Sequence, residues 1–366
     1  MRKSEDQTRL PSQPASQARA LRPGRERCGQ GITPLKVITT GLILSGILII
    51  IILVSLSLGP ARISIKDVLK WITGYKLADQ TAWMILLKIR LPRILLAGLV
   101  GFTLSLGGVV FQALLRNPLA EPFILGVSSG AAVGAITGIV FGLGYNIGVP
   151  LLSFIGALFT TLLVLGIASR HGGLESSTLL LTGVIVNAFF TAIIMFFIAT
   201  TSDSRLHSIL FWLYGDLSQS RYVQLSISLP IILIVSGIIY LFSRHLNLIA
   251  GGEESALQMG VEVELLKWIS FLGISLVTGI VVSFSGIIGF VGLIVPHLMR
   301  MFLGPDHRLL IPASAIGGAV FLIVADTLAR TILSPSELPV GVITAFLGAP
   351  FFIWLLKQRG SQWTQS

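Results

Sequence analysis

Residues 122–169 read PFILGVSSGAAVGAITGIVFGLGYNIGVPLLSFIGALFTTLLVLGIAS and contain no Asp, Glu, Lys or Arg. A helix needs about 20 apolar residues to cross a hydrocarbon core of about 30 Å. The stretch is therefore long enough for two crossings, and Gly142, Gly144 and Pro150 mark a short turn between them. Only helices and closed barrels satisfy their backbone polar groups in lipid. The stretch predicts a pair of membrane-spanning helices.

The rest of the 366-residue chain has the same character. Hydrophobic residues make up 53% and charged residues 11%, and the mean hydropathy is +0.88. A soluble domain has about 25% charged residues, so the composition indicates an all-α membrane protein. A net charge of +10 suggests nucleic acid in a soluble protein, but basic residues gather in the cytoplasmic loops of membrane proteins. We predict ten spans, near residues 35–58, 92–115, 122–142, 148–168, 177–201, 225–243, 267–285, 288–303, 309–330 and 338–357.

These spans define three parts of the chain. Residues 1–34 are basic and polar, which predicts a disordered tail. Residues 35–357 form the transmembrane domain, and residues 358–366 a short second tail. The first apolar run is too long for a secretory signal, so we expect an uncleaved span. An even number of spans and the basic tail place both termini in the cytoplasm. The only cysteine, Cys28, excludes an internal disulfide.

The sequence offers little catalytic chemistry. It contains no G-x-x-x-x-G-K-[ST] phosphate loop and no H-E-x-x-H motif, and its five histidines form no ligand pair at helical spacing. We therefore expect no bound cofactor and no metal site on this chain. The spans also lack the carboxylates that ion-coupled carriers use, apart from Asp326. Asp326 lies four residues before Arg330 on the same helix face, so an ion pair is expected.

Small residues recur where helices approach closely. Gly130, Gly134, Gly138 and Gly142 are four residues apart, so they share one face of the third span. Such a stripe allows two backbones to pack against each other in a membrane.

Two charged segments stand out between the spans. Arg90 and Arg93 flank Pro92 where the second span begins, and Pro92 suits the first turn of a helix. Arginines there can interact with lipid phosphate or with a partner. On the other side of the membrane, residues 248–260 read LIAGGEESALQMG. Glu253 and Glu254 open a short helix that Gly260 can end, and a second short helix over residues 261–267 leads into the seventh span. This segment is predicted to be an ordered elbow.

Several motifs resemble the permease family of importers for iron-siderophores, haem and cobalamin. They are the R-L-P-R of residues 90–93, GLVGFTLSLGGVVFQALLRNPLAEPFILGVSSGAAVG of residues 98–134, and GEESALQMGV of residues 252–261. GFVGLIVPHLMRMFLGPDHRLLIP of residues 289–312, and ADTLAR with ELPVGVITAFLGAPFFIWLL in residues 325–356, belong to the same pattern. The resemblance covers residues 35–356. The basic tail departs from it.

The resemblance implies a type II ABC importer permease in the inner membrane that moves a metal chelate by alternating access. The chain would form a homodimer in contact with membrane lipid, with two ATP-binding-cassette ATPase subunits that use ATP and Mg, and with a substrate-binding protein. The elbow residues implied to couple to the ATPase are Gly252, Glu253, Glu254, Ala256, Leu257 and Gly260. The residues implied to dock the binding protein are Arg90, Arg93 and Arg330.

Two rival functions follow from composition alone. One is a proton-coupled secondary transporter of a small organic solute, and the other is a membrane-embedded enzyme. The enzyme would need clustered His, Asp or Glu within the spans, which the sequence does not supply.

Overall fold

A computed structural model describes residues 33–61, 63–73, 80–169 and 173–359. All regular elements in these ranges are helices. They are α1 (Pro34–Ser57), α2 (Ile65–Ile72), α3 (Gln80–Met84), the π-helical turn η2 (Ile85–Arg90), α4 (Leu91–Leu114), the 3₁₀ turn η3 (Pro122–Leu125), α5 (Val127–Val140), α6 (Gly148–Ala168), α7 (Ser176–Thr200), α8 (Asp203–Leu213), α9 (Tyr222–Leu241), α10 (Ser243–Gly251), α11 (Glu253–Gln258), α12 (Val263–Ser285), α13 (Val291–Leu303), α14 (His307–Thr331) and α15 (Val340–Arg359). The predicted tail at residues 1–34 lies outside the described residues except for its last two residues, and Cys28 lies outside them as well.

Each of the ten predicted spans falls on an apolar helix. Seven helical stretches in the described ranges are long and apolar enough to cross a membrane: α1, the continuous helix from Gln80 to Leu114, α6, α7, α9, α12 and α14. The other three, α5, α13 and α15, have shorter apolar stretches of 10–17 residues. The short α5 follows from the segment before it, where η3 and Gly126, with φ +72°, take up residues that we had assigned to the third span.

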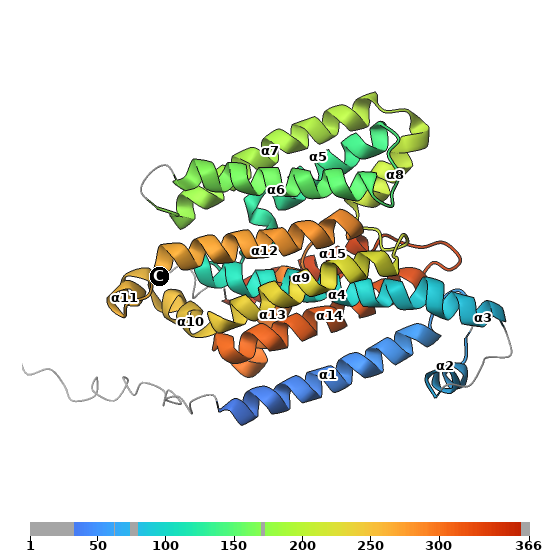
Figure 1. Cartoon of the computed structure of the whole chain (residues 1–366), viewed down its shortest axis with the longest axis horizontal. Helices are drawn as coiled ribbons and strands as arrows, with labels where there is room; N and C mark the ends of the chain where they lie inside the picture. The colour runs from blue at the N-terminus through green and yellow to red at the C-terminus, as the bar shows by residue number, and fades with distance from the viewer. Residues whose placement is uncertain (1–32, 62, 74–79, 170–172, 360–366) are drawn as a thin grey trace, which may run out of the picture.

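The helices are arranged in layers (Figure 1). Helices α5, α6 and α7 form a group that packs on α12, and α4 runs between α12 and α14. Helix α1 lies on the opposite side, against α14. The beginning of α1 and the helices α10 and α11 lie at one end of the bundle, called the α11 end below. Helices α2 and α3 lie at the other, called the α2 end.

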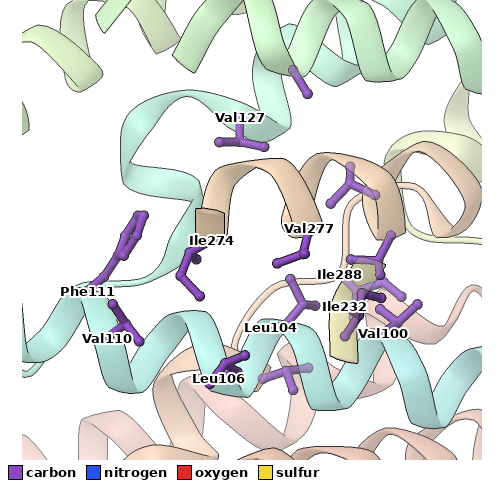
Figure 2. Close-up of a cluster of buried hydrophobic side chains, with 14 of the residues drawn as sticks. Val100, Leu104, Leu106, Val110, Phe111, Val127, Ile232, Ile274, Val277 and Ile288 are labelled. Atoms are coloured by element: carbon purple, nitrogen blue, oxygen red, sulfur yellow. The ribbon is translucent and has the colours of Figure 1, made fainter. Parts of the chain in front are cut away.

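The core centres on α4, whose side chains are buried over most of its length. Figure 2 shows α4 residues such as Leu104 and Val110 facing Ile274 and Val277 of α12. The ring of Phe111 meets Phe271 edge to face, with 5.2 Å between the centroids. Lipid is as apolar as these side chains, so close packing rather than the hydrophobic effect stabilises such contacts in a membrane.

Glycines set the closest helix contacts. A Cβ at Gly101 of α4 would overlap the carbonyl of Gly318 in α14. The predicted stripe on α5 is confirmed for Gly130, Gly134 and Gly138, which pack against α6. Gly142 has open space around it and adopts φ +70° just after the helix. It therefore belongs to the turn and not to the contact.

Pro92 lies in the first turn of α4, as predicted, but α4 continues from helical residues before it. The helix is continuous from Gln80 to Leu114, so Pro92 lies inside it. Proline lacks an N–H and its ring clashes with the carbonyl four residues earlier. The π-helical turn η2 directly precedes it, with the N–H of Leu91 donating to the carbonyl of Leu86. This wider turn accommodates the proline.

Candidate functional site

The three arginines predicted to dock a partner lie together at the α2 end, within the protein. Arg93 of α4 donates from Nε to Asp326 Oδ1 at 2.9 Å and from Nη1 to Glu337 Oε2 at 2.6 Å. Arg330 Nε lies 3.1 Å from Asp326 Oδ2, which confirms the expected ion pair within α14. Asp326 is fully buried, so its charge depends on these two guanidinium groups.

Backbone and hydroxyl groups complete this cluster. Arg330 Nη2 donates to Ser55 Oγ of α1 at 2.9 Å. Arg90 donates to the carbonyl of Leu56 at 2.6 Å and to that of Ala61. The cluster therefore joins the ends of α1, α4 and α14. It balances three arginines against Asp326 and Glu337 and leaves one excess positive charge.

The side chains of all three arginines are packed inside the protein. The exposed fractions are 3% for Arg90, 6% for Arg93 and 3% for Arg330. A buried charge needs partners, and each arginine finds them on helices distant in the sequence. Local spacing revealed only the pair of Arg330 with Asp326. Docking a binding protein stays a prediction, and it requires these side chains to leave their present partners.

The elbow at the α11 end is ordered as predicted in its first half. Gly252, with φ +141°, precedes α11, and Gly260, with φ +81°, follows it. Both values lie in the region that favours glycine. The predicted second short helix over residues 261–267 is wrong, because α12 begins at Val263 and continues unbroken to Ser285. Helix α10, before the elbow, was not predicted.

The elbow residues divide into two faces. Glu254, Leu257 and Gly260 are exposed, and Leu257 is 59% exposed. Met259, which the sequence did not single out, is 67% exposed. Ala256 is fully buried against the bundle. The elbow thus presents an apolar tip with a carboxylate beside it and is anchored through its other face.

Glu253 belongs to the anchored face. Its Oε2 accepts a hydrogen bond from Lys267 Nζ at 2.7 Å, and the same ammonium donates to the carbonyl of Leu174 at 2.9 Å. Leu174 lies just before Glu175, the N-cap residue of α7. Lys267 is 4% exposed. One buried cation therefore joins α11, α12 and the start of α7. Nothing local in the sequence indicates the partners of Lys267.

The geometry defines a multi-helix membrane protein with an ordered elbow at one end, and the sequence has no P-loop. Comparisons with known proteins agree. The model of the FecCD transport family matches residues 47–358. A cobalamin import system permease protein, BtuC, of Halobacterium salinarum is 44% identical over 280 residues, covering 76% of this chain and 75% of that protein. The hemin transport system permease protein HmuU of Yersinia pestis is 38% identical over 322 residues, covering 86% and 95%.

A solved structure agrees as well. A metal-chelate type ABC transporter in an inward-facing conformation is 34% identical, with a TM-score of 0.78, covering 88% of this chain and 99% of that chain.

The chain is the permease subunit of an ABC importer of the metal-chelate type. It belongs to the FecCD transport family. ATP hydrolysis is done by a separate subunit, and the class implies ATPase and binding-protein partners. The two rival functions, a proton-coupled carrier and a membrane enzyme, are thereby set aside. Asp326, the one candidate proton carrier, is held between two arginines.

Proposed function

We propose that this chain imports cobalamin or haem and that the ATPase drives it through the exposed tip of α11. The observation that carries the mechanism is the Lys267 bridge, because it connects that tip to two long helices. Closure of the ATPase would displace α11, and the bridge would pass the displacement to α12 and α7. A partner can drive such a change only by binding one state better than the other.

The choice of cargo is supported by the relatives. One is a cobalamin permease and another a hemin permease. Both cargoes are large metal-containing macrocycles. The test is uptake by the chain reconstituted in vesicles with its ATPase and binding protein, using cobalamin, hemin and a ferric siderophore in separate assays. We expect ATP-dependent uptake of cobalamin or hemin. Uptake of the siderophore alone would contradict this assignment.

The proposal also fixes the orientation. The ATPase acts from the cytoplasm, so the α11 end faces the cytoplasm and the start of α1 lies there too (Figure 1). The α2 end then faces the binding protein. The arginine cluster lies at that end, and docking there would require acidic groups of the binding protein to compete with Asp326 and Glu337. Two copies of the chain would enclose the path, which the mass of the detergent-purified complex tests.

Substitutions at the tip of α11 test the coupling surface. Leu257→Glu places a charge in an apolar contact, and Glu254→Lys reverses an exposed charge. We expect each to weaken association with the ATPase by 10-fold or more, since central interface residues are worth about 2 kcal/mol. Leu69→Glu on α2 is the matched control, because Leu69 is similarly exposed at the other end. Unchanged association for both α11 variants would contradict the assignment.

A further inference from the structure

A large cavity opens at the α11 end, separate from the elbow tip and from the arginine cluster. Its volume is about 1050 Å³, and its walls come from the ends of α1, α4, α10, α13 and α14. Small-molecule sites have volumes of about 300–1,000 Å³, so this space can hold a sizeable group. Helix α10 and the beginning of α1, which contribute to its walls, lie at the left-hand end of the bundle in Figure 1.

The charged side chains that line the cavity are mostly positive. Lys36, Arg116, Arg300 and Arg308 contribute four cations, and Asp306 contributes one carboxylate. Asp306 is already paired, because Arg308 Nη2 donates to it at 2.6 Å. This hydrogen bond is the main reason that the pKa of Asp306 falls to about 2, so the carboxylate stays ionised at neutral pH. Three cations therefore remain without a carboxylate partner among the described residues.

These three cations are held in different ways. Arg300 is partly buried in α13, and its Nη2 donates to Gln112 Oε1 of α4 at 2.9 Å. Arg116 is exposed just after α4 and adopts φ +46°, which costs conformational energy in a residue other than glycine. Lys36 is exposed in the first turn of α1. The neutral amide of Gln112 does not balance the positive charge of Arg300. An anion bound in the cavity would therefore interact with the whole charge of this guanidinium group.

The start of α14 is not what would hold that anion. Its first backbone N–H groups are already used, because His307 N donates to Asn247 Oδ1 at 2.8 Å and Arg308 N donates to Asp306 Oδ1 at 2.9 Å. Recognition therefore falls to the guanidinium and ammonium groups. Arginine pairs well with phosphate oxygens, which it can contact through two N–H groups at once.

The cavity also adjoins a surface that suits acyl chains. Helix α1 exposes large apolar side chains directly after Lys36, including Ile38, Leu42 and Ile43. Phe302, in the cavity wall, is 75% exposed. Basic pockets between helices at the cytoplasmic side of a membrane are typical sites for anionic headgroups. A free anion would contact the cations but not these apolar side chains, whereas a phospholipid would contact both.

We infer that the cavity between α1, α4, α10, α13 and α14 binds the phosphodiester headgroup of an anionic phospholipid, with an acyl chain lying along α1. The site is on the same side of the membrane as the coupling elbow, and α10 joins the two. It takes lipid from the cytoplasmic leaflet in the orientation proposed above.

Binding is measured on the full chain in neutral detergent by titration with phosphatidylglycerol, phosphatidylcholine or inorganic phosphate and by the shift in thermal unfolding. We expect a saturable shift with phosphatidylglycerol alone. The variant Lys36→Gln/Arg116→Asn removes two cations, and Asn tolerates the backbone of Arg116. Each cation near an anionic surface contributes about a factor of five, so affinity should fall about 25-fold. High salt should weaken the binding further.

Lys66→Gln/Lys70→Gln on α2 is the matched control, because it removes two exposed cations at the other end. It should keep the affinity of the unmodified chain. An equal loss in this control would overturn the site, as would an equal shift with inorganic phosphate. If Lys36→Gln/Arg116→Asn loses association with the ATPase but keeps its lipid affinity, the cavity is a contact site for the ATPase and not for lipid. If the double variant unfolds in phosphatidylcholine, Lys36→Gln alone replaces it, with an expected fivefold loss.

Discussion

Removing the ammonium of Lys267 is the sharpest test of how movement passes from α11 into the bundle. Lys267→Met keeps most of the side-chain volume and deletes both hydrogen bonds, to Glu253 at 2.7 Å and to the carbonyl of Leu174 at 2.9 Å. We expect the folded chain to persist with α11 no longer tied to the start of α7. Transport should then fall more than ATP hydrolysis does.

Substitutions at Lys267 and at Glu253 should lower the free energy of unfolding by different amounts. A hydrogen bond to a charged group contributes about 1.5–3 kcal/mol, but Lys267→Met also removes the penalty of burying a cation. The Glu253 side chain is 33% exposed and can be solvated when its partner is lost. We therefore expect a loss in the free energy of unfolding of about 1–2 kcal/mol. Glu253→Ala leaves the cation buried beside one carbonyl and should cost about 2–3 kcal/mol, below the 3–5 of a fully buried pair.

Two measurements check this. Equilibrium unfolding in mixed micelles, on both single variants and the double variant, should show a coupling energy of about 1 kcal/mol. Reconstituted vesicles should show more ATP hydrolysed for each molecule imported. Lys70→Met, which removes an exposed lysine of α2, is the control and should change neither. A normal ratio of ATP to cargo in Lys267→Met would refute the transmission role, even if stability fell as expected.

Three further predictions concern packing and charge. Gly101→Val should abolish folded yield in detergent, because α14 backbone occupies the space of the new side chain; a monodisperse, active variant would contradict the contact. Asp326→Asn should lower stability by about 3–5 kcal/mol by leaving buried arginines underpaired, and a change below 1 kcal/mol in unfolding would count against the cluster. Asp306 has a pKa lowered to about 2, chiefly by its hydrogen bond with Arg308, so its stabilising effect is complete above about pH 4 and is lost as pH falls toward 2. Thermal unfolding of Asp306→Asn and the unmodified chain should therefore differ at pH 6 and converge near pH 2.

Sequence reasoning predicted the helices well because lipid imposes a strong local rule. Uncharged runs of about 20 residues have few alternatives to a spanning helix. The α5 stripe and the pair of Asp326 with Arg330 were also predictable, since both depend on spacing within one helix. The elbow between Gly252 and Gly260 could be predicted because two glycines and two glutamates mark a short helix. Long motifs then indicated the family.

Contacts between distant helices were beyond that reasoning. For Arg90 and Arg93 the sequence left lipid phosphate and a partner protein open as contacts. Their partners lie on other elements, at Glu337, Asp326 and the backbone at the end of α1. The continuous helix through Pro92 was missed for a related reason, because its π-helical turn resolves the clash only in three dimensions.

By itself, the sequence determined that this protein is a helical membrane permease without its own ATP site, because lipid solvation and the absence of a phosphate loop are local properties. Only the tertiary structure decided which charges are available. It turned Glu253 inward to Lys267 and left Glu254 and Leu257 exposed, and it gathered three arginines into the protein. The reason is physical: a buried charge is stable only beside its partners, and those partners come together through folding.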